Sequence, residues 1–134
     1  MSIFNNLIKK NDSFSGWIPG FDKTKTIYTH IPKCAGTSIS LAMYKEDPWH
    51  YKMEDYKKNI SKIKFNRYFK FAFVRNPFDR LLSSYLYSFA QIKKYPNTSV
   101  AFATKYPTFK DFVHDWVNVS NVNSHYFFCP QIMT

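Results

Sequence analysis

The sequence predicts an α/β fold in which helices flank a short parallel sheet, and three features of the chain lead to this prediction. The first is the stretch from Thr24 to Tyr44, TKTIYTHIPKCAGTSISLAMY, which reads as a strand, a tight turn and a helix. The second is a strand-like run over residues 69–74. The third is the set of helical patterns that separate and follow these strands. Because such crossovers are right-handed and parallel, both strand ends are expected at one edge of the sheet.

The elements before the second strand each have a local signal. In order, we expect a helix over residues 1–10, a loop over 11–23, a strand over 24–31, and helices over 37–46 and 51–64. Glycine and proline punctuate the loop, and β-branched and aromatic residues mark the strand. Asp47-Pro48 is expected to end the helix over 37–46. The apolar face of the helix over 51–64 carries Met53, Tyr56, Ile60 and Ile63.

The remaining elements follow the same logic. In order, we expect a strand over 69–74, a helix over 78–94, a loop over 95–107, a helix after Thr108, and an irregular tail after Asn118. Thr108 and Asp111 have the spacing of a helix capping box. The long helix has an apolar stripe at helical intervals, formed by Phe78, Leu81, Leu82, Tyr85, Leu86, Phe89 and Ile92.

Length and charge limit the classes of protein. A chain of 134 residues is the size of one domain, so we expect a single domain over residues 1–134. The net charge of +10 points to an anionic partner, which on charge alone could be nucleic acid, a membrane surface, a glycan or a phosphorylated nucleotide. The aromatic content of 20% is too high for a low-complexity disordered chain.

Cysteine usage and the N-terminus indicate the compartment. Cys34 and Cys129 are too few for a disulfide framework, and no Cys/His spacing predicts a zinc site. The N-terminal residues contain no long apolar run, so the sequence predicts neither a signal peptide nor a transmembrane segment. We therefore expect a reducing, cytoplasmic environment and no metal.

The turn from Pro32 to Ser38 is predicted to bind an anion. The unpaired N–H groups of a helix's first turn and the positive end of its dipole attract phosphate or sulfate. This turn is not a Walker A loop, because Lys33 opens it instead of directly preceding the hydroxyl residue. The second strand ends in Arg75, where a triphosphatase usually has a magnesium-binding acidic residue. Lys33 and Arg75, each just past a strand end, are therefore expected to face one crevice that binds a metal-free anion.

Two motifs carry a resemblance to a known family. IPKCAGTS, residues 31–38, closely resembles the 5′-phosphosulfate loop of sulfotransferases that use 3′-phosphoadenosine 5′-phosphosulfate (PAPS), especially the carbohydrate type that includes heparan sulfate 2-O-sulfotransferase. KFAFVRNPFDRLLSSY, residues 70–85, is similar to that family's 3′-phosphate motif. The resemblance covers residues 24–90 and implies a core like that of P-loop NTPases. It also implies PAPS as donor, PAP as product, no metal, and a hydroxyl acceptor, in particular a carbohydrate.

The resemblance also implies roles for single residues. Arg75 and Ser83 match the residues that bind the 3′-phosphate, and arginine suits this task because its planar fork binds phosphate bidentately. Arg80 is expected to add a salt bridge or a weaker anion contact. In the 5′-phosphosulfate loop, Lys33 would neutralise charge on the leaving oxygen and Cys34 would have a packing role. The loop residues expected to bind the cofactor are Lys33, Cys34, Ala35, Gly36, Thr37 and Ser38.

Sulfuryl transfer needs a base, and imidazole suits that role near neutral pH. His50 lies shortly after the first motif's helix, about where relatives have a histidine, and is the predicted catalytic base. Lys33 is the other predicted catalytic residue. His30 is expected to be packed or hydrogen-bonded, and His114 to lie on a helix surface. His125 precedes a Pro-Gln stretch that borders the acceptor cleft in relatives, so it is the candidate substrate contact.

The chain ends at Thr134, where relatives continue, so we expect a minimal member, a truncation lacking the family's C-terminal part, or a piece that needs a partner.

Three other functions stay open from the sequence. A catalytically silent module could retain the nucleotide site or bind anionic glycans. A nucleotide kinase with an unusual loop would bind ATP with magnesium. Nonspecific nucleic-acid binding, which we do not expect, would depend steeply on salt.

Overall fold

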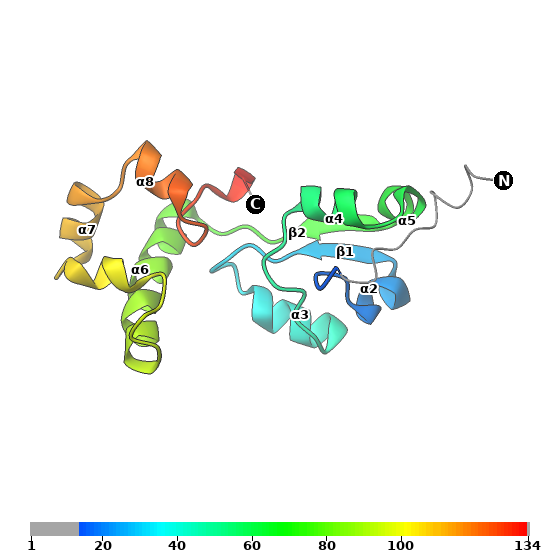
Figure 1. Ribbon diagram of the computed structural model, residues 1–134, viewed down its shortest axis with the longest axis horizontal. Coiled ribbons are helices and arrows are strands. Elements are labelled where there is room, and N and C mark those ends of the chain that lie inside the picture. The colour runs from blue at the N-terminus through cyan, green and yellow to red at the C-terminus, as the bar shows by residue number, and fades with distance from the viewer. Residues whose placement is uncertain (1–13, 134) are drawn as a thin grey trace. The chain divides into compact units, whose positions relative to one another are not determined.

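The computed structural model describes residues 14–133, which form two compact units (Figure 1). The first unit ends at Val74, and the second spans Arg75–Met133. The helix predicted over residues 1–10 lies outside the described residues. The architecture is α/β with a two-stranded parallel sheet and several helices, which confirms the predicted fold class.

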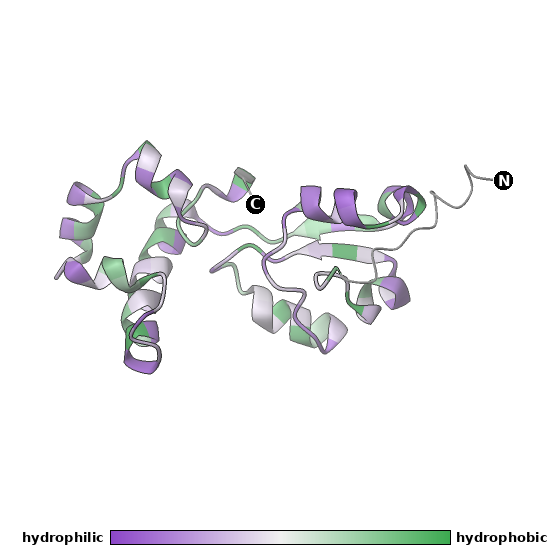
Figure 2. Cartoon of the chain, viewed as in Figure 1, coloured by the Kyte–Doolittle hydropathy of each residue, from purple (hydrophilic) through white to green (hydrophobic). Residues whose placement is uncertain are grey.

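The first unit contains the sheet. Its elements are α2 (Pro19–Thr24), β1 (Thr26–Thr29), α3 (Gly36–Tyr44), α4 (Met53–Asn59), α5 (Lys62–Arg67) and β2 (Phe69–Ala72). The strands are parallel and in register from Thr26 opposite Phe69 to Thr29 opposite Ala72, as the crossover predicted. In Figure 1, α4 and α5 lie on one side of the strands, and α2 and α3 lie on the other. In Figure 2, α4 is largely hydrophilic, as expected of a helix with an exposed outer face.

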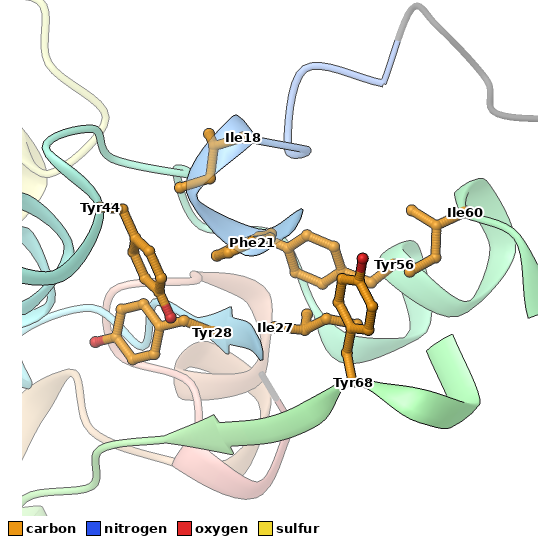
Figure 3. Close-up of a cluster of buried hydrophobic side chains, with 8 residues drawn as sticks. All are labelled: Ile18, Phe21, Ile27, Tyr28, Tyr44, Tyr56, Ile60 and Tyr68. Carbon is orange, nitrogen blue, oxygen red and sulfur yellow. The ribbon is translucent and has the colours of Figure 1, made fainter. Parts of the chain in front are cut away.

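Aromatic side chains build the core of this unit (Figure 3). Ile27 and Tyr28 are neighbours on β1 and therefore point to opposite faces of the sheet, yet both are fully buried. β1 is thus covered on both faces. Edge-on ring contacts, such as that of Phe21 with Tyr44 at 5.1 Å between ring centroids, fill the space on the α2–α3 side. This packing holds β1, from whose C-terminal end the turn into α3 departs.

One helix prediction and one loop prediction in this unit are wrong in part. The helix expected over 51–64 is divided, because Ile60 has an extended backbone and the Ser61 hydroxyl accepts the Lys64 N–H to start a new helix. Ile63 is consequently exposed rather than on a core face. The loop expected over 11–23 contains the start of α2, whose first residue is Pro19. Proline is favourable there because its missing N–H would have no helical partner.

The second unit is helical. Its elements are α6 (Pro77–Lys94), η1 (Ala101–Lys105), α7 (Phe109–Asp115), α8 (Val119–Ser124) and η2 (Gln131–Met133). The capping box of Thr108 and Asp111 is confirmed at the start of α7. The tail predicted to be irregular after Asn118 instead forms α8, because the Asn118 side chain accepts the Asn121 N–H and caps a new helix.

The apolar stripe predicted for α6 is only partly buried. Tyr85 packs in a core with Phe112 and other aromatic residues, but Phe78 is 78% exposed. Polar side chains of the same helix are buried instead, namely Arg80, Ser84 and Ser88. Their burial is possible because the structure gives each of them a backbone carbonyl as a hydrogen-bond partner.

Asp22 connects three parts of the first unit. Its carboxylate accepts hydrogen bonds from Lys64 Nζ at 2.6 Å, Tyr68 Oη at 2.6 Å and Trp17 Nε1 at 3.0 Å. Burial acts to raise the pKa of Asp22, but the hydrogen bonds and the Lys64 charge outweigh it and lower the pKa to about 2. The ionised form is therefore more favourable in the folded chain than in the unfolded chain.

We expect Asp22→Asn to lower the free energy of unfolding at pH 7 by about 1 kcal/mol, discounted for partial exposure. Because the folded pKa is depressed, this stabilisation is present above about pH 4 and is lost as the pH falls toward about 2. Urea unfolding across that range tests this. Glu54→Gln, which breaks the exposed Glu54–Lys58 pair, is the control and should change little. A loss that does not shrink at low pH would contradict the expectation.

Candidate functional site

The turn from Pro32 to Ala35 carries β1 into α3. Lys33 and Ala35 have φ angles of 65° and 61°, a left-handed conformation that is uncommon for residues other than glycine. The first hydrogen bond within α3 joins Ile39 N to Ala35 O, so the N–H groups before Ile39 lie ahead of the helical ladder. Left-handed residues beside a helix N-terminus form a concave set of N–H donors that suits an anion.

Gly36 is required by a close approach of His30. A Cβ atom at residue 36 would lie 1.8 Å from His30 Cδ2 and 2.1 Å from His30 Nε2. The φ of Gly36 is not positive, so the backbone itself does not demand glycine. The His30 ring, which is 5% exposed, therefore forms a wall of the turn. This confirms that His30 is packed and hydrogen-bonded.

The partner of His30 is Asp47, which sequence reasoning treated only as a helix end. His30 Nδ1 lies 2.9 Å from Asp47 Oδ1, and Asp47 also accepts the Trp49 N–H at 3.0 Å and the Thr37 hydroxyl. Burial acts to raise the pKa of Asp47, but these hydrogen bonds and the nearby His30 hold it below its ordinary value. The carboxylate is therefore ionised at neutral pH, and His30 Nδ1 is the donor.

His50 has a defined tautomer. Its Nδ1 lies 2.9 Å from the backbone oxygen of His30. A carbonyl oxygen only accepts, so Nδ1 carries the proton and Nε2 is the nitrogen with the lone pair. Although part of the residue reaches solvent, desolvation and the nearby His30 lower the pKa of His50, against opposing effects of the His30 carbonyl and Asp47. His50 is therefore neutral at pH 7, as a general base must be.

The turn from Pro32 to Ala35 and the side chains of His30, Asp47 and His50 form one site. The ring centroids of His30 and His50 are 4.1 Å apart, and the His30 ring contacts Gly36. The arrangement thus places a neutral histidine beside a turn that contains a lysine and whose geometry suits an anion. Chemically, it can hold an anionic group and accept a proton beside it.

In the second unit, a side-chain amide fixes the backbone of Arg75. Gln131 Oε1 accepts the Arg75 N–H at 2.8 Å, and Gln131 Nε2 donates to the Arg75 carbonyl at 2.8 Å. Arg75 is exposed, and Ser83, farther along on α6, is half-buried. The paired amide contact specifies the conformation from which the Arg75 side chain projects. The sequence had associated Gln131 only with an acceptor cleft.

Arg80 supports the tail of this unit. The residue is 4% exposed, and its guanidinium donates to the carbonyls of Cys129 at 2.8 Å and Phe127 at 3.3 Å. Ser84 Oγ donates to the same Phe127 carbonyl at 2.9 Å. Arg80 therefore forms a buried link between α6 and the segment that ends at Gln131.

His125 has backbone partners at both ring nitrogens. Its Nε2 lies 3.0 Å from the Ser99 carbonyl, so Nε2 is a donor, and its Nδ1 accepts the Phe127 N–H at 3.4 Å. The His125 ring also contacts the rings of Phe102, Tyr126 and Phe128. His114 is exposed beside Asp115 on α7, and its pKa is raised by the hydrogen bond and charge of that carboxylate.

The described residues also bear on a second basic surface, metal binding and membrane spanning. A basic hollow is lined by Lys25, Lys64 and Arg67. It lies at the N-terminal ends of the two strands, whereas the Lys33 turn follows the C-terminal end of β1. Over residues 14–133, no group of three or more metal-ligating side chains could hold a metal ion. Over the same residues, no helix has the length and apolar character needed to cross a membrane.

The chain was compared with known proteins. A model described as the sulfotransferase family matches residues 21–128, which include both the Lys33 turn and the Arg75 motif. No curated protein and no solved structure matches the chain.

The contact between Gly36 and His30 gives a direct test of the site. We expect Gly36→Ala to lower the free energy of unfolding by about 1–3 kcal/mol, because its Cβ atom would overlap the His30 ring. In a His30→Ala background the same change should cost much less, as urea unfolding of both pairs would show. Ala35→Gly, at a position whose φ suits glycine, is the control and should not destabilise. Equal costs of Gly36→Ala in both backgrounds would contradict the assigned contact.

Proposed function

The chain belongs to the sulfotransferase family, and we propose that it transfers the sulfuryl group of PAPS to a hydroxyl group of a carbohydrate. The observation that supports this most is the hydrogen bond of 2.9 Å from His50 Nδ1 to the His30 carbonyl. It sets the tautomer of a general base next to an anion-binding turn. The resemblance of residues 31–38 to the 5′-phosphosulfate loop supports PAPS as the donor.

The Lys33 turn would hold the sulfuryl donor. The residues present fit such a group, since left-handed Lys33 and Ala35 precede the N–H groups at the start of α3. PAPS supplies an activated sulfuryl group when bound. As that group leaves, negative charge grows on the oxygen that bridges it to phosphate, and the Lys33 ammonium is proposed to neutralise that charge. The Ser38 hydroxyl would bind the same anion, and Cys34 would shape the turn.

His50 would activate the acceptor. Its Nε2 takes the proton of the acceptor hydroxyl while the hydroxyl oxygen forms a bond to sulfur and the bond from sulfur to the bridging oxygen breaks. The His50 imidazolium formed in this step keeps its Nδ1–H bond to the His30 carbonyl. The negative charge of Asp47 also favours it. These two contacts offset part of the desolvation that disfavours the imidazolium.

The 3′-phosphate of the donor would bind to Arg75 and Ser83. Arginine can grip a phosphate with two parallel N–H bonds, and Gln131 holds the Arg75 backbone in one conformation. The His125 ring is proposed to contact the acceptor. The net charge of +10 is compatible with an acidic glycan as acceptor, and also with a silent module that only binds such a glycan.

His50→Ala separates the enzyme from the silent module. We expect transfer of radiolabelled sulfate from PAPS to a panel of polysaccharides to fall about 10²-fold to 10⁴-fold, with the dissociation constant of PAP unchanged. His114→Ala, which removes an exposed histidine of α7, is the control and should keep full activity. Full transfer by His50→Ala would assign the base to another group. PAP binding without transfer by the wild-type chain would favour the silent module.

A further inference from the structure

Asp47 gathers donors from three segments of the first unit. One is the side chain of His30, just after β1, at 2.9 Å from Oδ1. Another is the backbone N–H of Trp49, the residue before His50, at 3.0 Å. The third is the hydroxyl of Thr37, in the first turn of α3. One half-buried carboxylate therefore connects the strand end, the anion-binding turn and the segment that carries the base.

Each of these contacts acts directly on a proposed functional group. The His30 backbone oxygen holds His50, and the His30 ring packs against His50 and Gly36. Trp49 has a φ of 62°, a conformation that a bulky residue adopts only when its surroundings impose it. The hydrogen bond from its N–H to Asp47 supplies such a constraint on the peptide that leads into His50.

The Thr37 contact changes what this residue can offer to a bound anion. A hydroxyl has a single proton to donate, and Thr37 directs it to Asp47. The lone pairs that remain on the Thr37 oxygen cannot bind an anionic oxygen. While this bond persists, Thr37 contributes to the anion through its backbone N–H, and Ser38 supplies the hydroxyl of the turn.

We propose that Asp47 is a positioning residue that sets the place of His50 relative to the anion-binding turn by holding His30, Thr37 and Trp49 together. The proposal rests on the proposed function, in which His50 is the base. It adds a residue that no motif indicates and gives Thr37 a structural hydroxyl. Misplacing a reacting group by about 1 Å can cost about 10²-fold in rate, so this geometry matters for catalysis.

Asp47→Asn keeps the shape of the side chain and removes its charge. The asparagine oxygen can still accept from His30 Nδ1 and the Trp49 N–H at the position of Oδ1, but a neutral amide favours the Nδ1–H tautomer of His30 less than a carboxylate does, so we expect a larger share of the His30 proton at Nε2. Long-range proton–nitrogen NMR spectra, assigned with His30→Ala and His50→Ala, report the tautomer of both rings whether or not the chain turns over. Glu46→Gln removes the same charge from the adjacent exposed residue and should leave both tautomers as in the wild type.

The same variants are compared for turnover. We expect Asp47→Asn to lower kcat for sulfate transfer about 10-fold to 100-fold while the KM for PAPS changes less than about threefold. Glu46→Gln should match the wild type in both constants. A kcat for Asp47→Asn equal to that of Glu46→Gln, with the tautomers of His30 and His50 unchanged, would overturn the proposal.

Thr37→Val provides a second variant in case Asp47→Asn does not fold. Because the Thr37 hydroxyl serves Asp47, its removal should lower kcat but leave the calorimetric dissociation constant of PAP within about threefold of the wild type. A loss of PAP affinity of about tenfold or more, with kcat unaffected, would show that the hydroxyl binds the anion and would overturn the proposal. Absence of transfer by the wild-type chain would instead refute the proposed function, and the NMR and PAP results would still decide the role of Asp47.

Discussion

The buried ring of His30 is the constraint on which the candidate site depends. It occupies the space that a side chain at residue 36 would need, and it donates to Asp47. Its backbone oxygen orients His50. A single residue just after β1 thus requires the glycine of the turn, pairs with the ionised Asp47 and sets the tautomer of His50, the proposed base. The aromatic core around Ile27 and Tyr28 covers both faces of this strand and keeps its end in place.

The second unit uses the same physical principle with different groups. Buried polar side chains must be hydrogen-bonded, and on α6 they find their partners in the backbone of the tail. Arg80 and Ser84 hold the carbonyls near Phe127, and Gln131 closes the segment onto the backbone of Arg75. Local order in this tail therefore decides the conformation of the arginine that is proposed to bind the 3′-phosphate.

The sequence was sufficient for the parallel strands, the turn between β1 and α3 and the capping box of Thr108, because these depend on local pattern and chain direction. It could not reveal Asp47, since the contact with His30 joins distant positions and no motif encodes it. Periodicity alone also placed Phe78 on the buried stripe of α6, whereas tertiary partners allowed Arg80 and Ser84 to be buried there. Hydrogen bonds between distant segments decided what local patterns could not.

The most direct measurement is a calorimetric titration of the folded chain, without magnesium, with PAP and with adenosine 5′-phosphate, which lacks the 3′-phosphate. The account predicts micromolar binding of PAP, and binding weaker by about 10-fold to 100-fold for the nucleotide without that phosphate or for Arg75→Ala. Arg67→Ala, on α5, is the matched control and should bind PAP normally. Equal affinity for the two nucleotides, or no binding of PAP, would contradict the account.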